Sequence, residues 1–274
     1  MKNTFIQTNG EYVTIGNIMV KVDSPLNTDY FKQFMRRENQ LMQILNSGLP
    51  NATDQFVEGA WLLIEDYPDE ANGYQDIMMA IERYEHTGAS AKARALADKM
   101  IASSAPEKYK LWSKGFLNRL DSLGKSMALQ FTAADGRKVD SSQMRGKVVL
   151  VDFWATCCGS CVAELPRVKA AWEKYQAQGL EVIGISCDTA KSDLEEYVKR
   201  HEIFWPQYFD GKQQNDNKFT VEFGIGGIPH MFLVDKKGVL RFDNVRANDK
   251  FYPKSGATSF EEKISNLLAE PTNF

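Results

Sequence analysis

Residues 148–161 read VVLVDFWATCCGSC. An apolar run typical of a buried strand, Val148 to Trp154, ends in a turn of small residues, and two cysteines spaced by two residues, Cys158 and Cys161, then begin a helical stretch. Unpaired backbone N–H groups and the helix dipole stabilise an anion at a helix N-terminus, so a Cys158 thiolate should form more readily than that of an ordinary cysteine. The stretch predicts an exposed dithiol where a strand meets a helix.

The composition is that of an ordinary globular protein. The chain has 274 residues, enough for two domains, with 43% hydrophobic and 25% charged residues. A net charge of −3 argues against a surface dedicated to nucleic acid or anionic lipid. No apolar run is long enough to cross a bilayer. We therefore expect neither nucleic acid nor membrane insertion, and the sequence does not predict the oligomeric state.

The four cysteines all lie beyond residue 156, at positions 157, 158, 161 and 187. A secreted framework held by disulfides spreads its cysteines along the chain. The clustering here indicates redox chemistry or metal binding instead.

The first 124 residues predict a helical domain. Residues 10–22 contain a β-rich run that favours a short strand or hairpin, and a helical period then extends from Asn27 to about Leu123. Five apolar faces follow, and their aromatic and methionine positions are interpreted as core. The breaks between them fall at residues 48–50, 68–69, 88–90 and 105–106. Five helices joined by short turns predict an antiparallel array.

From residue 125 to 274 the pattern is that of an α/β domain. Leu129–Phe131 and Lys138–Val139 flank an Asp-Gly turn and predict a hairpin. Strand and helix signals then alternate, which predicts a sheet with helices on its faces. The predicted strands are Val148–Trp154, Glu181–Ser186, Met231–Asp235 and Val239–Phe242, and the predicted helices are Gly159–Gln178, Lys191–His201 and Phe260–Ala269.

Several motifs of this second domain occur in a family order. Val-Asp-Phe-Trp-Ala precedes the cysteine pair, Pro166 follows Cys161 by five residues, and Gly-Ile-Pro at 227–229 precedes Phe-Leu-Val-Asp at 232–235. Residues 125–270 thus resemble the thioredoxin superfamily, and within it the TlpA/ResA-like thiol-disulfide oxidoreductases. The resemblance implies a central mixed sheet flanked by helices. It also implies an enzyme whose partners are protein thiols or disulfides and an upstream electron donor or acceptor.

The two cysteines then have distinct expected roles. Cys158, at the helix start, attacks the partner, and the more shielded Cys161 resolves the mixed disulfide. The two-residue spacer brings both sulfurs within bonding reach. The redox-active pair itself needs no cofactor. Half of a zinc knuckle is the structural alternative, but it needs a second ligand pair, for which only Cys187 and the three histidines remain.

Asp152 and Pro229 complete the expected catalytic set. A carboxyl group in an apolar strand should have a raised pKa. Asp152 matches the buried aspartate of thioredoxins, which implies a general acid/base for Cys161; a turn cap is the alternative interpretation. By resemblance Pro229 is cis, which exposes the backbone of Ile228 for pairing with an extended partner segment.

Two residues depart from the family pattern within the motif. Cys157 stands where these proteins usually have Trp, and Ser160 replaces the common Pro. Ser160 restores a backbone N–H and adds a hydroxyl, so we expect a somewhat stronger oxidant. Cys157 is either a bystander or an auxiliary thiol that is able to form an alternative disulfide with Cys161.

Three further residues are candidates for auxiliary roles. Cys187 ends a core strand, and we favour a small buried residue over a second site thiol. We expect His230, next to the proline, to be exposed; the alternative is that it tunes the thiolate or touches the partner. Glu164 matches a carboxylate of TlpA-type proteins and either modulates access or pKa or supports the first turn of the helix.

Protein thiol-disulfide exchange is the leading functional hypothesis, and three alternatives stay open. Cys157 and Cys161 with a histidine resemble the ligands of Sco-type copper proteins. A thiol peroxidase is disfavoured because Gly159, not Cys, stands three residues after Thr156. The helical domain suggests a partner-docking module with vestigial redox activity. The resemblance implies the bacterial periplasm or cell envelope, with a signal segment removed, while the cytoplasm stays open.

Overall fold

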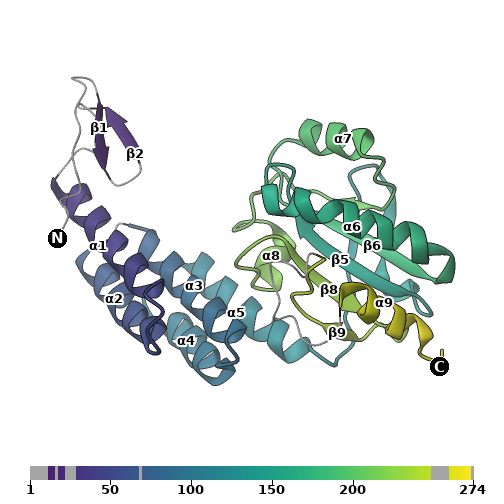
Figure 1. Cartoon of the computed structure of the whole chain (residues 1–274), viewed down its shortest axis with the longest axis horizontal. Coiled ribbons are helices and arrows are strands. Elements are labelled where there is room, and N and C mark those ends of the chain that lie inside the picture. Colours follow the sequence, from purple (N-terminus) through teal and green to yellow (C-terminus); the bar gives the residue numbers. More distant parts are fainter. Residues whose placement is uncertain (1–11, 16–17, 22–28, 68–69, 248–258, 273–274) are drawn as a thin grey trace. The chain divides into compact units, whose positions relative to one another are not determined.

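The computed structural model describes residues 12–15, 18–21, 29–67, 70–247 and 259–272 (Figure 1). The chain forms two compact units, residues 1–109 and 110–274. Each unit is described by itself.

The N-terminal unit contains a strand pair and an array of helices. Strands β1 (Tyr12–Ile15) and β2 (Ile18–Lys21) are antiparallel, which confirms the predicted hairpin; residues 10, 11, 16, 17 and 22 of the predicted segment lie outside the described residues. The helices of this unit are α1 (Asp29–Leu45), α2 (Ala52–Asp66), α3 (Asn72–His86) and α4 (Ser90–Ala102). The next helix, α5 (Glu107–Ser122), begins in this unit and continues into the C-terminal unit. α1 packs on α2, α2 on α3, and α3 on α4.

The five predicted helices are confirmed, and their apolar faces form the core of the array. Phe56, Ala60, Ile77 and Ile81 are fully buried where α2 and α3 meet. Gly88 has a φ of +80° after α3, a conformation that favours glycine over residues with a Cβ. The predicted break at residues 68–69 lies outside the described residues.

The C-terminal unit is built on a five-stranded mixed sheet with the order β7-β6-β5-β8-β9. The strands are β5 (Val148–Trp154), β6 (Leu180–Ser186), β7 (Gln207–Tyr208), β8 (His230–Val234) and β9 (Leu240–Phe242). β5 and β6 are parallel, as are β6 and β7, whereas β8 is antiparallel to β5 and to β9. The predicted hairpin is present as β3 (Gln130–Thr132) and β4 (Lys138–Asp140).

Helices cover both faces of this sheet (Figure 1). α6 (Gly159–Tyr175), α7 (Lys191–Arg200) and α9 (Phe260–Ala269) contribute to one core cluster, and α8 (Lys218–Glu222) with the β3–β4 hairpin contributes to the other. Side chains alternate along β5: Leu150 and Trp154 enter the α6 cluster, and Val151 and Phe153 enter the α8 cluster. The predicted α/β architecture is confirmed, but β7 and α8 are too short to have been recognised by periodicity.

The two units divide within α5, between Tyr109 and Lys110, whereas the sequence pattern changes near residue 125. Backbone packing explains why α5 from Lys110 onward belongs to the C-terminal unit. A Cβ added at Gly115 would lie 2.1 Å from the carbonyl oxygen of Val221, and one added at Gly224 would lie 2.1 Å from the backbone nitrogen of Phe116. Only glycine permits so close an approach of the two segments.

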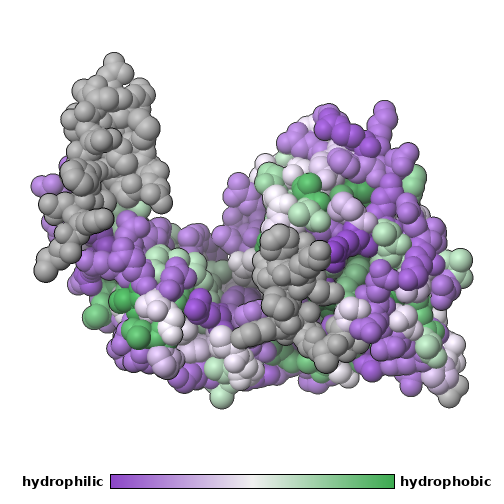
Figure 2. All heavy atoms as spheres, viewed as in Figure 1, coloured by the Kyte–Doolittle hydropathy of each residue, from purple (hydrophilic) through white to green (hydrophobic). Residues whose placement is uncertain are grey.

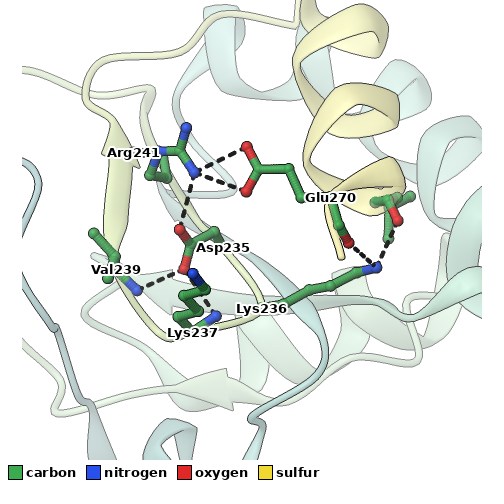
Figure 3. A network of polar contacts seen from close by, with 7 residues as sticks. Asp235, Lys236, Lys237, Val239, Arg241 and Glu270 are labelled. Carbon is green, nitrogen blue, oxygen red and sulfur yellow. Dashed lines mark hydrogen bonds and ion pairs between the residues drawn. The ribbon is translucent and has the colours of Figure 1, made fainter. Parts of the chain in front are cut away.

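Polar contacts fix the end of α9 against the β8–β9 turn (Figure 3). Arg241 bridges Asp235 at 3.0 Å and Glu270 at 2.9 Å. The Lys236 ammonium donates to the carbonyl oxygens of Leu268 at 2.6 Å and of Glu270 at 2.9 Å. A cation at a helix C-terminus satisfies carbonyl groups that have no partner within the helix.

The outer surface of α7 carries hydrophilic side chains (Figure 2), and Leu194 is its one buried residue. Among the described parts of the chain, no helix combines the length and the hydropathy of a bilayer span.

We predict that Gly115→Ala lowers the free energy of unfolding by about 3 kcal/mol, because the atoms it would meet are backbone atoms that cannot turn aside. Urea unfolding of the full chain measures the loss. Gly159→Ala is the matched control, since a Cβ there meets no atom within 4 Å. Equal stability of the two variants would contradict the close packing of α5.

Candidate active site

The two cysteines at the start of α6 form a disulfide. Their Cα atoms lie 5.2 Å apart. Cys158 is the N-cap of α6, and its Sγ accepts the backbone N–H of Cys161 at 3.2 Å. Cys158 is half-buried and Cys161 is buried, at 4% exposure. The predicted pairing and the greater shielding of Cys161 are confirmed.

The segment before β8 lies against the more accessible sulfur. The Ile228–Pro229 peptide bond is cis, as the resemblance implies. The carbonyl oxygen of Ile228 lies 3.8 Å from Sγ of Cys158. A backbone group is therefore available next to the atom that a partner would have to approach.

Ser160 and Cys157 flank the disulfide. The Ser160 hydroxyl lies 3.4 Å from Sγ of Cys158, which places a donor beside the sulfur, as predicted. Cys157 is exposed and its thiol is free. Cys157 takes no part in the disulfide of this structure.

Asp152 occupies the middle of β5, on the face that carries Cys161. Its strand neighbours are Gly184 and Met231, and the alternation of β5 places it with Leu150 on the α6 side. The side chain is 4% exposed, and its Oδ1 has no hydrogen-bond partner. The alternative interpretation of Asp152 as a turn cap is wrong, because the residue lies within the strand.

Three effects set the pKa of Asp152. Burial is the largest and raises the pKa, the charge of Glu164 raises it further, and the charge of Arg246 lowers it. The result is a pKa of about 7. The predicted upward shift is confirmed, and the group can gain or lose a proton near neutral pH.

Glu164 forms a buried ion pair with Arg246. The Arg246 guanidinium lies 2.6 Å from Oε1 of Glu164, and the two side chains are 10% and 3% exposed. Glu164 therefore does not support the first turn of α6 but faces the segment that follows β9. Sequence analysis missed Arg246 because nothing in its local sequence distinguishes it from a solvated arginine.

A second missed residue holds the turn before the disulfide. Asp188 is buried, and its Oδ1 accepts the backbone N–H and the hydroxyl of Thr156 at 2.9 and 2.7 Å. The Ser186 hydroxyl donates to the other carboxylate oxygen at 2.9 Å. These bonds tie the turn from β5 to α6 to the end of β6. Asp188 stands just after the predicted strand Glu181–Ser186, and the carboxyl ends of strands are where α/β proteins form their sites. This position is the signal in the sequence that could have identified it.

Cys187 is buried at 5% exposure, which confirms the favoured interpretation. Burial, together with the charges of Asp188 and Asp210, raises the pKa of its thiol. Cys187 is therefore a poor nucleophile in the folded chain.

The expectation that His230 is exposed is wrong. Its side chain is 3% exposed, and Nε2 lies 2.6 Å from Oδ1 of Asp243. The imidazole packs edge-to-face on Phe153 and Phe232, on the face of the sheet opposite Asp152. The ring can be buried because Asp243 supplies a hydrogen-bond partner. Its position on the α8 side of the sheet, away from the α6 side that carries Cys161, does not support tuning of the Cys158 thiolate.

Asp243 is held in turn by Arg119 of α5. The Arg119 guanidinium lies 2.6 Å from Asp243 and donates to the carbonyl oxygen of Phe223 at 3.0 Å. Burial would raise the pKa of Asp243, but Arg119 and the hydrogen bond with His230 hold it well below its ordinary value. The carboxylate is thus a fixed charge behind His230.

Across the described residues, no group of three or more His, Cys, Asp or Glu side chains is placed to hold a metal ion.

Comparisons with known proteins find similarities in the C-terminal part of the chain. Residues 124–243 match the model of the AhpC/TSA family. The thiol-disulfide oxidoreductase ResA of Bacillus cereus is 29% identical over 107 residues, which are 39% of this chain and 60% of that protein. ResA of Geobacillus thermodenitrificans is 29% identical over 135 residues, 48% of this chain and 75% of that protein. The chain thus spans about three fifths of the length of the first curated relatives.

Among solved structures, a putative thiol:disulfide interchange protein DsbE from Chlorobium tepidum matches with 25% identity and a TM-score of 0.46, over 54% of this chain and 99% of that one. Residues 124–243 thus match the AhpC/TSA family model and are similar in sequence to ResA thiol-disulfide oxidoreductases.

Proposed function

We propose that this chain is a protein thiol-disulfide oxidoreductase. The observation that carries the proposal is the Cys158–Cys161 disulfide at the N-terminus of α6, with a titratable buried carboxyl group, Asp152, on the same face of the sheet. The ResA relatives, which carry this activity in their names, support it.

The proposed reaction starts from the reduced chain and a partner with a disulfide. The Cys158 thiolate attacks one partner sulfur, so that a mixed disulfide forms and the second partner sulfur leaves as a thiolate. Cys161 then loses its proton, and its thiolate attacks Sγ of Cys158. The partner leaves with both sulfurs reduced, and the chain keeps the Cys158–Cys161 disulfide. An upstream dithiol returns two electrons and two protons, and the steps run backwards when the partner is the dithiol.

The helix N-terminus favours the first step. The N–H of Cys161 already donates to Sγ of Cys158 in the disulfide, and the same donor is available to a Cys158 thiolate. The carbonyl oxygen of Ile228 lies 3.8 Å from Sγ of Cys158. An extended partner segment that donates a backbone N–H to this oxygen would lie beside the attacking sulfur.

Asp152 is the proposed proton acceptor for Cys161. Its carboxylate form is populated above a pH of about 7, where it can take the thiol proton directly or through one water. The same group returns a proton when the reaction runs backwards. The cost is a buried, unpaired carboxyl group in the centre of the sheet.

The reaction uses the disulfide as its only redox group, so we propose no cofactor. The proposed partners are protein thiols and disulfides, and the proposed setting is the bacterial cell envelope, in keeping with the sequence resemblance.

Serine substitutions separate the two cysteines. We predict that Cys158→Ser abolishes reduction of insulin disulfides and that Cys161→Ser stalls at a mixed disulfide with the substrate, visible as a reducible adduct by mass spectrometry. Cys157→Ser is the matched control and keeps activity within about twofold, because its thiol lies outside the disulfide. Activity retained by Cys158→Ser would mean that another group is the nucleophile.

Asp152→Asn should gain stability and lose activity. Because the pKa of Asp152 rises from 3.8 to about 7 on folding, its ionisation lowers the stability of the folded chain as the pH rises through this range. The asparagine of the variant does not titrate between these pH values. The free energy of unfolding of the variant therefore equals that of wild type below pH ~4 and exceeds it by about 4 kcal/mol above pH ~7. Urea unfolding at pH 3.5 and 8 measures the difference.

The same variant should also lose the rise in the rate of Cys161 attack near pH 7. A stability difference that does not depend on pH would show that folding does not raise the pKa of Asp152, and would remove its proposed role.

Ser160→Ala should make the pair less oxidising, because the hydroxyl beside Cys158 stabilises the thiolate. Loss of one such hydrogen bond corresponds to a fall in reduction potential of roughly 10–30 mV. Equilibration with glutathione buffers measures the potential, and Ser192→Ala, an exposed serine of α7, is the control. An unchanged or higher potential in Ser160→Ala would contradict the proposed contribution.

A further inference from the structure

Arg246 joins two parts of the candidate site that are far apart in the sequence. It follows β9 and is 8% exposed. Its Nε donates to Oε1 of Glu164 in α6 at 2.9 Å, and its Nη1 donates to the carbonyl oxygen of Pro229 at 2.9 Å. One planar guanidinium thus contacts both the helix that begins with the cysteines and the proline segment that lies against Cys158.

The carboxylate of Glu164 is held on both oxygens. Oε1 accepts from Arg246, and Oε2 accepts the backbone N–H of Ala247 at 2.9 Å. Glu164 stands three residues after Cys161, so both side chains lie on one face of α6. The Arg167 guanidinium also donates to the carbonyl oxygen of Ala247 at 3.0 Å. Two hydrogen bonds, besides the Glu164–Arg246 ion pair, therefore hold the segment after β9 against α6.

We propose that Arg246 is a positioning residue for disulfide exchange: it fixes the α6 dithiol against the Ile228–Pro229 segment, and it offsets the charge of Glu164 beside Asp152. The proposal rests on the proposed function and deepens it. Arg246 itself does not touch the sulfurs or a partner in this scheme.

The geometry requires arginine rather than any cation. The guanidinium donates in two directions from a rigid plane, whereas a lysine ammonium is a single point on a flexible stem. Lysine at position 246 would keep the charge opposite Glu164 but would not hold the Pro229 carbonyl oxygen in the same geometry. Positioning and charge can therefore be separated by substitution.

The charge effect acts on Asp152. The groups whose charges bear on it are Glu164 from α6 and Arg246 from the segment after β9. Cys161 on α6 is in the disulfide and carries no charge, and the raised pKa of Cys187, directly after β6, keeps that thiol neutral. Removing the arginine alone leaves the carboxylate of Glu164 buried without its countercharge. The proton affinity of Asp152 must then rise.

Three variants of the full chain test the proposal: Arg246→Lys, Arg246→Met, and Arg246→Met combined with Glu164→Gln. Arg246→Lys keeps the positive charge but lacks the planar guanidinium. Arg246→Met removes the positive charge opposite Glu164, and the double variant removes both charges. The first readout is the titration midpoint of the Asp152 carboxyl group by carbon-13 NMR of aspartate-labelled protein, assigned with Asp152→Asn. The second is the rate of insulin disulfide reduction.

The midpoint of Asp152 should rise by about one pH unit in Arg246→Met and return to within about 0.3 unit of wild type in Arg246→Lys and in the double variant. The exchange rate should fall at least about tenfold in all three variants, because each loses the guanidinium that holds Pro229. A Lys variant with wild-type rate would overturn the positioning role. An unmoved midpoint in Arg246→Met would overturn the charge role.

The proposed function and the role of Arg246 can fail separately. A wild-type chain without exchange activity would contradict the proposed function, whereas the titration midpoints of Asp152 would still test the charge role of Arg246. If Arg246→Met fails to fold, the Lys and double variants decide both roles: a wild-type exchange rate in either overturns the positioning role, and a midpoint of the double variant far from that of wild type overturns the charge balance.

Discussion

The register of β5 is the constraint on which the candidate site depends. Leu150 and Asp152 point to the α6 side of the sheet, and Val151 and Phe153 point to the other. Because side chains alternate along a strand, a slip of one residue would move Asp152 away from Cys161 and bring apolar side chains to its place. The strand is buried along its whole length, so the hydrophobic effect opposes any slip. The core thus fixes the position of Asp152, a group whose burial it does not favour.

That group shows how function and stability conflict in this domain. Asp152 has a buried oxygen without a hydrogen-bond partner, an arrangement that destabilises a fold. The ion pair of Glu164 and Arg246 is not explained by stability, because a well-packed hydrophobic pair in its place would stabilise the fold as much. Together, however, they place one negative and one positive charge near Asp152 and leave its pKa near neutrality. Asp152, Glu164 and Arg246 are therefore better explained by a role in proton transfer than by a contribution to the stability of the fold.

The sequence predicts those parts of the site that are local. Cys158, Cys161 and Asp152 are specified by one strand–turn–helix segment, and Pro229 stands in a second short motif. Arg246 carries no such signal, because its partners come from two other parts of the chain and its burial follows from their arrangement. The wrong expectation for His230 has the same cause: a histidine is buried when a distant partner satisfies it, and Asp243 was not visible as that partner. The short elements β7 and α8 offered too few residues for a period to be detected.

Two buried charge clusters, one on each face of the sheet, meet at the proline segment. On the α6 face, Arg246 holds the carbonyl oxygen of Pro229. On the opposite face, Asp243 holds the imidazole of His230, the next residue, and is itself paired with Arg119. Because Pro229 and His230 are hydrogen-bonded on both faces of the sheet, this segment has less conformational freedom than an exposed loop. Moving it would break charged hydrogen bonds in a low-dielectric interior. The backbone beside Cys158 can therefore be accessible to a partner and still be rigid, which is the combination that a selective exchange of disulfides requires.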